Sequence, residues 1–150
     1  EMSLQEKVME AMKTAMKAKD TQSLEALRSV KSALLLAQTE TGAKADLTED
    51  EEIKLLQKQV KQRKDSAAIY NEQNRLDLAE PELIQAKVIE QFLPQQLSEE
   101  EVSKIVDGII TETGASSMAD MGKVMGLASA KLAGKADGKT ISTVVKSRLS

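Results

Sequence analysis

Apolar side chains recur every three or four residues along most of the chain, the spacing that places them on one face of an α-helix. No segment shows the alternating pattern of a half-buried strand. The first two apolar stripes are Leu4, Val8, Met12 and Ala15, and then Leu24, Leu27, Val30 and Leu34. This pattern predicts an all-α protein.

Short signals mark where the helices begin and end. A hydroxyl residue followed three positions later by glutamate forms a capping box, which satisfies free backbone N–H groups of the first turn. The three such pairs are Ser3 with Glu6, Thr48 with Glu51, and Ser98 with Glu101. Pro81 suits a first helical turn, and Pro94 ends the helix before it. The predicted helices are 3–18, 22–41, 48–74, 81–92, 98–113, 117–133 and 140–149.

The domain boundary falls in LPQQLS, residues 93–98. A chain of 150 residues is long enough for two small cores. We therefore predict an N-terminal helical domain, residues 1–93, built around the long helix 48–74, and a small C-terminal three-helix bundle, residues 94–150. The segment 40–47 is expected to be an ordinary connector.

Composition narrows the chemistry. The chain has no cysteine and no histidine, and its aromatic residues are Tyr70 and Phe92. Thiolate nucleophiles, imidazole bases, disulfides and nearly all zinc sites are thereby excluded. No run of about 18 apolar residues is present, and the first helix carries acids such as Glu6 and Glu10, unlike an acid-poor transit peptide. We expect a cytosolic protein without a membrane partner.

Charge is distributed unevenly along the chain. The formal net charge is -3, but residues 121–150 hold six basic residues and one acid, Asp137. A polyanion would meet this end first. The acidic runs 49–52 and 99–101 fall in the first turns of predicted helices, where they complement the helix dipole. Capping explains these acids, and we predict neither a metal nor a cofactor.

The long helix 48–74 raises two questions about charge. Its apolar face includes Arg63, a guanidinium in a core position that needs a carboxylate. We expect the stem to pack while the head snorkels to solvent or pairs with an acid on a neighbouring helix; a ligand site is the alternative. On another face, we expect a solvated row of lysines with acid–lysine pairs such as Asp50 with Lys54, although this row could also receive phosphates. The candidate patch of this domain is Lys54, Lys58, Lys61, Arg63 and Lys64.

Residues 117–133 predict an unusual helix with two stripes. The apolar stripe is Met121, Val124, Met125, Ala128 and Leu132. The stripe beside it has no bulk and consists of Gly122, Gly126, Ser129 and Ala133. Each interior glycine costs about 1 kcal/mol relative to alanine, so something must offset that cost. We favour a neighbouring helix packed closely over the small residues; the alternative is a nucleic-acid backbone held by flanking lysines.

The turn that follows carries two lysines beside free backbone amides. Gly134 is expected to cap the preceding helix, and Lys135 and Lys139 flank the turn. The glycine spacing is too short for a phosphate-binding loop and no strand precedes it, so we predict no nucleotide site. Because aromatic rings are so few, any RNA would be read through its folded shape, phosphates and 2′-hydroxyls.

These segments resemble the GatB/YqeY family across nearly the whole chain. The C-terminal part of the resemblance is DMGKVMG at 120–126, GKADGK at 134–139, and residues 144–149. The N-terminal part is VKQRKDS at 60–66, Tyr70, Arg75, Asp77, Leu78, Ala79, Glu82, and the LPxQL run at 93–97. The chain departs from the family pattern at Asn74, where glycine is usual, at Gln85, where an acid is common, and at Phe92, where tyrosine is usual. Asparagine tolerates a left-handed backbone, so the turn at Asn74 should survive.

The resemblance implies a helical N-terminal domain and a C-terminal bundle similar to the tail of the GatB subunit of the tRNA-dependent amidotransferase. In that family the tail helps to hold the tRNA body, while other domains convert Glu or Asp on the tRNA to Gln or Asn. The candidate RNA-facing residues are Gly122, Lys123, Gly126, Lys131, Lys135 and Lys139, with Lys146 from the same basic segment.

We therefore expect a non-catalytic protein whose last third binds tRNA or another folded RNA and whose first domain docks on another protein. Transamidation needs an amidase centre and an ATP site, and the sequence shows neither. The resemblance leaves an enzymatic alternative, carbon–nitrogen ligase activity with glutamine as the amido donor. A third hypothesis is a protein-only adaptor, whose binding would respond little to salt.

Overall fold

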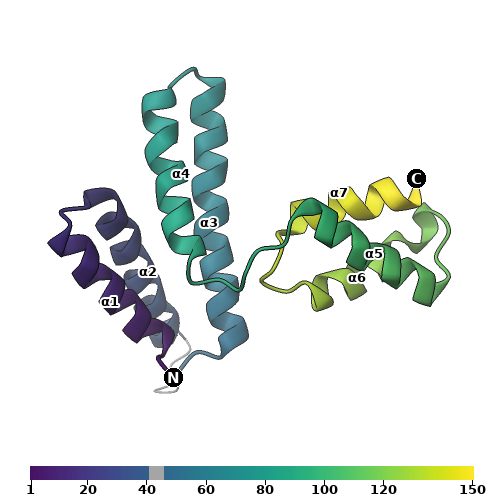
Figure 1. Ribbon diagram of the computed structural model, residues 1–150, viewed down its shortest axis with the longest axis horizontal. Helices are drawn as coiled ribbons and strands as arrows, with labels where there is room; N and C mark the ends of the chain where they lie inside the picture. The colour runs from purple at the N-terminus through teal and green to yellow at the C-terminus, as the bar shows by residue number, and fades with distance from the viewer. Residues whose placement is uncertain (41–45) are drawn as a thin grey trace. The chain divides into compact units, whose positions relative to one another are not determined.

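The computed structural model describes residues 1–40 and 46–150, which form seven α-helices, one 3-10 helix and no strand (Figure 1). The elements are α1 (Leu4–Lys17), α2 (Thr21–Glu40), α3 (Glu49–Glu72), α4 (Leu76–Glu90), α5 (Glu99–Thr113), η1 (Met118–Asp120), α6 (Met121–Lys131) and α7 (Gly138–Leu149). The prediction of an all-α protein is confirmed. Thr41, the last residue of one predicted helix, lies outside the described residues, as does most of the 40–47 connector.

The chain divides into two compact units, residues 1–93 (unit 1) and residues 94–150 (unit 2). Each has its own hydrophobic core, built almost entirely from aliphatic side chains. The core of unit 1 is Val8, Ala15, Ala26, Leu27, Val30, Leu34, Leu56, Val60, Ala86 and Ile89. The core of unit 2 is Val102, Val106, Ile109, Val124, Ala128, Leu132, Ala136, Ile141, Val144, Val145 and Leu149. No helix in the described part of the chain is both long enough and apolar enough to cross a membrane.

All three predicted capping boxes are present. At the start of α5, the Ser98 hydroxyl accepts a hydrogen bond from the Glu101 backbone N–H at 3.1 Å, and the Glu101 carboxylate accepts one from the Ser98 N–H at 3.0 Å. The same reciprocal pair starts α1 and α3. Each box satisfies two backbone donors that a helix start leaves free, which fixes where the helix begins.

The prediction that a helix begins at Pro81 is wrong, because α4 begins at Leu76 and Pro81 lies in its interior. The chain reverses direction at Asn74, which adopts the left-handed conformation with φ of 58°. The Arg75 backbone N–H then donates to the Tyr70 carbonyl at 2.8 Å, which closes α3 and lets the next helix start at once. Pro81 removes one backbone hydrogen bond from α4, and the rest of the helix tolerates this loss. The expectation that the Asn74 turn survives is confirmed.

The segment predicted as one helix, 117–133, is shorter and divided. The 3-10 helix η1 precedes α6, and α6 ends at Lys131 with Leu132 as its C-cap. Gly134 has a positive φ of 77°, but it follows the end of the helix instead of capping it. The carbonyl of Gly134 accepts from Gln96 Nε2 at 2.6 Å, and the carbonyl of Lys135 accepts from the Leu97 N–H at 2.8 Å. These bonds fix the turn within unit 2 and end α6 earlier than its sequence pattern suggests.

Candidate nucleic-acid interface

The helix α6 has one buried face and one open face. Val124 and Ala128 are fully buried, as is the C-cap residue Leu132, which confirms the predicted apolar stripe. The residues of the predicted small stripe, in contrast, are all exposed; they are Gly122, Gly126, Ser129 and Ala133. The open face therefore consists mainly of backbone and short side chains.

No described helix covers the glycines of this face, so the interpretation we favoured from the sequence is wrong. Apart from the adjoining residues and backbone of α6 itself, a Cβ atom added at Gly122 or at Gly126 would meet no described atom within 4 Å. The helices α5 and α7 contact α6 through the core residues of unit 2, on the opposite side. The described fold thus gives no steric reason for glycine at these positions, and it shows nothing that offsets the cost of about 1 kcal/mol each in a helix interior.

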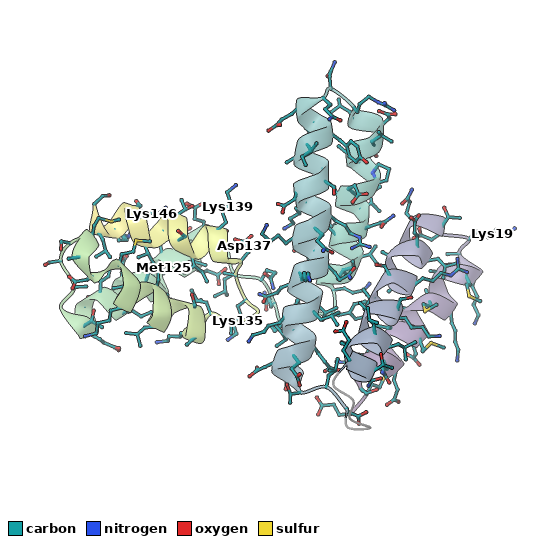
Figure 2. The ribbon with its side chains drawn as sticks, turned by 180° about the vertical axis from the view of Figure 1, so that it is seen from behind. Lys19, Met125, Lys135, Asp137, Lys139 and Lys146 are labelled. Atoms are coloured by element: carbon teal, nitrogen blue, oxygen red, sulfur yellow. The ribbon has the colours of Figure 1, made fainter. Side chains whose placement is uncertain are left out.

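The candidate lysines occupy both helices and the turn between them. Lys123 and Lys131 lie on α6, Lys135 lies in the turn, and all five candidate lysines are exposed. Lys139 and Lys146, one in the first turn of α7 and one in the last, are seven residues apart and share one face of that helix. Figure 2 shows these two extending from the same side of α7, with Lys135 on the other side, beside the turn. The structure therefore brings Lys139 and Lys146 onto one face and leaves Lys135 on another.

The candidate lysines of unit 2 have no acidic partner among the residues that the structure describes. None of the five, Lys123, Lys131, Lys135, Lys139 and Lys146, takes part in an ion pair there. Five of the seven acids of unit 2 lie on α5 instead; they are Glu99, Glu100, Glu101, Asp107 and Glu112. The other two, Asp120 and Asp137, are the N-caps of α6 and α7. One ion pair of the described residues joins α5 to α7, between Arg148 Nε and Asp107 at 2.7 Å. The positive charge of α6 and of the turn is therefore available to an anion from solvent.

The turn itself is well bonded through its backbone. Asp137 is the N-cap of α7, and its carboxylate accepts from the Thr140 N–H at 2.7 Å. Because Gln96 and Leu97 hold the carbonyls on the other side of the turn, Lys135 and Lys139 project from a fixed backbone. Sequence patterns gave no sign of Gln96 in this role, because the bond joins residues 38 apart in the chain.

The candidate patch of unit 1 differs because several of its charges have partners. Lys61 Nζ lies 2.6 Å from Asp65, and Lys64 Nζ lies 3.6 Å from Glu90. The predicted pair of Asp50 with Lys54 is absent from the ion pairs of the described residues. Lys54 and Lys58 are exposed, one helical turn apart on α3. Two of the five residues of this patch, Lys61 and Lys64, are thus paired with acids on the surface, although not in the pair that the sequence predicted.

Arg63 does not pair with a carboxylate in the described structure, contrary to our expectation. Its Nε donates to Gln85 Oε1 at 3.2 Å, and its Nη1 donates to the side chain and carbonyl oxygens of Gln59, at 2.8 and 3.1 Å. Gln85 in turn donates to Gln22 at 2.9 Å, and Gln59 accepts from the Ser29 hydroxyl at 2.9 Å. Amide oxygens from α3 and α4 therefore satisfy the guanidinium, and the network reaches across to α2.

The fold and this surface define an all-helical protein with an exposed, basic helix of unusually small residues. A family model described as "Yqey-like protein" matches residues 5–149, and the chain therefore belongs to this family. One of the subunits of the Glutamyl-tRNA(Gln) amidotransferase of Thermococcus gammatolerans is 42% identical to this chain over 73 residues. That match covers 46% of this chain and 12% of the relative, so the chain corresponds to a small part of that protein.

Proposed function

We propose that this protein binds tRNA or another folded RNA through unit 2, without catalysing a reaction on it. The interface is the open face of α6 together with the turn and the lysine-bearing face of α7. Its candidate residues are Gly122, Lys123, Gly126, Lys131, Lys135, Lys139 and Lys146.

The observation that carries this proposal is the open glycine face of α6. Gly122 and Gly126 are exposed, and no described atom of the chain occupies the space where their side chains would be. A polyphosphate backbone needs a close approach to the protein backbone, and a helix face without bulk permits it. Lys123 on α6 and the lysines of the turn and of α7 then supply charge for phosphates, and none of them forms an ion pair among the described residues that a phosphate would first have to displace.

The relative supports the choice of RNA. Its name states that it belongs to an amidotransferase acting on glutamyl-tRNA(Gln), and the similar segment is a small part of a much longer chain. We propose that this protein shares with that relative an RNA-binding element, and that it works in the cytoplasm, where charged tRNA is used. A tRNA bound in this way would be recognised by shape and phosphate positions, since the chain has so few aromatic rings.

The test is a filter-binding titration of total tRNA with the full chain at graded salt. Neutralising about 4 to 5 phosphates predicts a slope of about -4 in a plot of log affinity against log salt concentration. Affinity should therefore fall by roughly two to three orders of magnitude between about 50 and about 200 mM salt. Undetectable binding at the lowest salt would refute the proposal, and a salt-independent affinity would favour the protein-only adaptor.

A matched pair of triple variants tests the location. Replacing Lys123, Lys135 and Lys139 by glutamate should reduce tRNA affinity by about a hundredfold or more, because three attractive contacts become repulsive. The control replaces Lys54, Lys58 and Lys61 of α3 by glutamate, which changes the net charge by the same amount in unit 1. Circular dichroism should show unchanged helical content for both. A greater loss of tRNA affinity in the control than in the unit 2 variant would show that the RNA binds at α3 instead.

The non-catalytic part of the proposal has its own test. The purified chain should release no ammonia from glutamine in the presence of tRNA and ATP, because a transamidation would need an amidase centre and an ATP site in addition to the RNA contact. Turnover above the level of a denatured sample would establish the carbon–nitrogen ligase alternative instead.

A further inference from the structure

The outer side of α1 carries a methionine stripe, defined here as Gln5, Met9, Met12 and Met16. The spacing of four, three and four residues is that of the a and d positions in a coiled coil. Met12 is half-buried against the core of unit 1, whereas Met9 and Met16 are 40% and 57% exposed. Exposed thioethers at this spacing form a narrow apolar seam that the described fold of one chain leaves uncovered.

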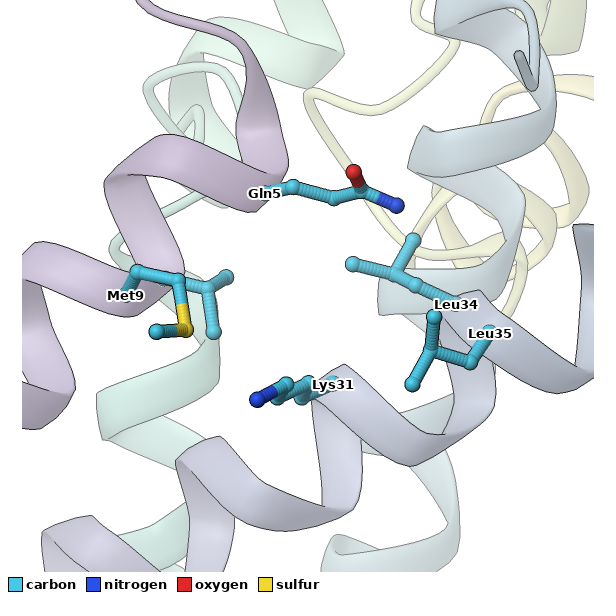
Figure 3. Close-up of a pocket in the computed structure, with 6 residues that line it drawn as sticks. Gln5, Met9, Lys31, Leu34 and Leu35 are labelled. Atoms are coloured by element: carbon cyan, nitrogen blue, oxygen red, sulfur yellow. The ribbon is translucent and has the colours of Figure 1, made fainter.

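A pocket in unit 1 adjoins the stripe between α1 and α2. It has a volume of about 130 Å³ and is closed on the inside by the buried side chains of Val8 and Leu34. Figure 3 shows Met9 of α1 on one side of this pocket, with Lys31 and Leu35 of α2 on the other. Leu35 is itself 50% exposed. The seam and the pocket together form a shallow apolar groove along the α1–α2 pair.

We propose that this groove is the interface of a two-fold homodimer, in which α1 packs antiparallel against α1 of a second copy. Met9 then lies opposite Met12 of the second copy, and Gln5 lies opposite Met16. Two-fold symmetry makes every contact occur twice, so a seam of only a few residues suffices to form a continuous row. Methionine suits such a seam because its flexible side chain adapts to a partner of the same kind.

The charges beside the stripe favour a second copy of the chain as the partner, and they favour the register just described for the two α1 helices. Glu6 and Lys13 are exposed and occupy equivalent positions beside the seam, on the side away from the buried Val8 and Ala15. In an antiparallel pair such positions face their own counterparts, and in the proposed register Glu6 meets Lys13 of the second copy and Lys13 meets its Glu6. Sliding the second helix by one heptad in either direction would instead bring Glu6 against Glu6, or Lys13 against Lys13.

A parallel arrangement is disfavoured by the same residues. In a parallel pair, Glu6 and Lys13 of one helix would face the positions of Val8 and Ala15 in the other. Those side chains are already buried in the core of unit 1 and offer the charges no partner. The antiparallel dimer is the arrangement in which both charges find partners and both apolar seams are covered. This interface is separate from the RNA surface of unit 2 and does not depend on it.

The dimer should be weak, since a 14-residue helix and the edge of its neighbour cover a small area. Small interfaces belong to transient complexes, and we expect a dissociation constant on the order of tens of micromolar. Sedimentation equilibrium of the full chain from about 5 to about 500 µM should therefore give an average mass rising from 16.3 kDa toward twice that value. A mass that stays at the monomer value throughout this range overturns the proposal.

Variants of the flanking charges test the register. Lys13→Glu places two acids opposite each other at both ends of the seam and should weaken association at least about tenfold. The matched control is Lys17→Glu, with the same charge change in the last turn of α1 but away from the seam, and it should change association less than about twofold. Equal weakening by the two variants would overturn the proposed contact.

Mixing provides the most specific result. Glu6→Lys alone should also fail to associate, but an equimolar mixture of Glu6→Lys with Lys13→Glu pairs opposite charges at both positions and should restore a heterodimer. Glu6 also accepts a hydrogen bond from the Ser3 N–H at 3.3 Å, so circular dichroism must confirm that Glu6→Lys retains α1. If it does not, Met9→Lys serves as the second disruptive variant and should abolish the dimer in the same assay. Failure of the folded mixture to associate, or dimerisation of folded Met9→Lys, overturns the proposal.

Discussion

The helices α3 and α6 both carry lysines that could bind phosphates, but on α3 most of the basic side chains near its middle have partners in the described fold, and on α6 they do not. On α3, Lys61 pairs with Asp65, Lys64 approaches Glu90, and Arg63 is held by amide oxygens. On α6, Lys123 and Lys131 have no acidic partner in the described residues, and the neighbouring face carries Gly122 and Gly126 in place of bulky side chains.

This difference distinguishes a charge that serves the fold from one available to a ligand. A phosphate approaching Lys61 would have to compete with Asp65, whereas a phosphate approaching Lys123 meets no such competition from the described residues. The α3 network also spans α2 and α4 through Gln85, so its loss would affect the core of unit 1. The predictions that follow separate the two regions, beginning with the largest effect.

The largest effect on stability should come from truncating a buried side chain in the core of one unit while the core of the other is unchanged. Leu132→Ala removes a fully buried side chain from unit 2 and should destabilise it by about 2 to 5 kcal/mol, and Ile89→Ala should do the same to unit 1. Because the two cores share no residue, each variant should lose hydrogen-exchange protection in its own unit only. Equal loss in both units would show that residues 1–93 and 94–150 unfold as one domain.

The next effect concerns the polar network around Arg63. Gln85 is 7% exposed, and Gln85→Leu leaves Arg63 Nε without its acceptor and Gln22 without its donor. The expected cost is about 1 to 3 kcal/mol, measured as the free energy of unfolding in urea. Gln85→Glu should cost less at neutral pH, because it restores an acceptor that is charged. A neutral effect of Gln85→Leu would mean that the network is not important for stability.

A smaller effect of opposite sign is expected on α6. Gly126→Ala adds a methyl group in open space and should stabilise the chain by about 1 kcal/mol, yet weaken tRNA binding if RNA lies on this face. Gly108→Ala is the matched control, since Gly108 lies in the interior of α5 and a Cβ there also meets nothing described within 4 Å. It should give the same stabilisation without changing tRNA binding. Loss of binding in both variants, or in neither, would remove α6 from the interface.

The helices could be predicted from the sequence because their signals are local. The capping boxes at Ser3, Thr48 and Ser98 and the apolar stripes depend on residues three or four positions apart, and the structure confirms them. The start of α4 could not be predicted in the same way. Pro81 is a strong local signal for a first turn, but the turn at Asn74 and the packing of α4 along α3 outweigh it.

The partners of Arg63 and the open face of α6 depend on contacts between distant segments. An apolar position for Arg63 correctly indicated that the guanidinium needs acceptors, but only the fold shows that these are Gln59 and Gln85. The sequence shows the glycines of α6, but it does not show on which side of that helix the neighbouring helices pack. The exposed face became evident only once α5 and α7 were seen to contact the other side.

The smallest predicted effect is on the pH dependence of stability. It compares the first turns of α3 and α5, which begin with the same kind of capping box. Hydrogen bonds from the Thr48 backbone N–H and hydroxyl lower the pKa of Glu51 below its ordinary value of 4.5. The next residue of α3 behaves oppositely, since partial burial, helped by the nearby carboxylates of Glu49 and Asp46, raises the pKa of Glu52. Stability from Glu51 is therefore full above pH 4.5 and is lost as the pH falls through its lower folded pKa.

For Glu52 the sign is reversed, because the folded chain holds its proton more tightly than the unfolded chain does. Ionised Glu52 thus lowers stability once the pH exceeds its raised folded pKa, and Glu52→Gln should raise the melting temperature at pH 7. The gain should disappear as the pH falls below the ordinary value of 4.5, where both forms are neutral. Glu100→Gln is the control in α5 and should give no gain, because Glu100 also lies in a first turn but is exposed. A gain in the Glu52 variant that persists at about pH 3, below the ordinary glutamate pKa, would contradict burial of the charge as its cause.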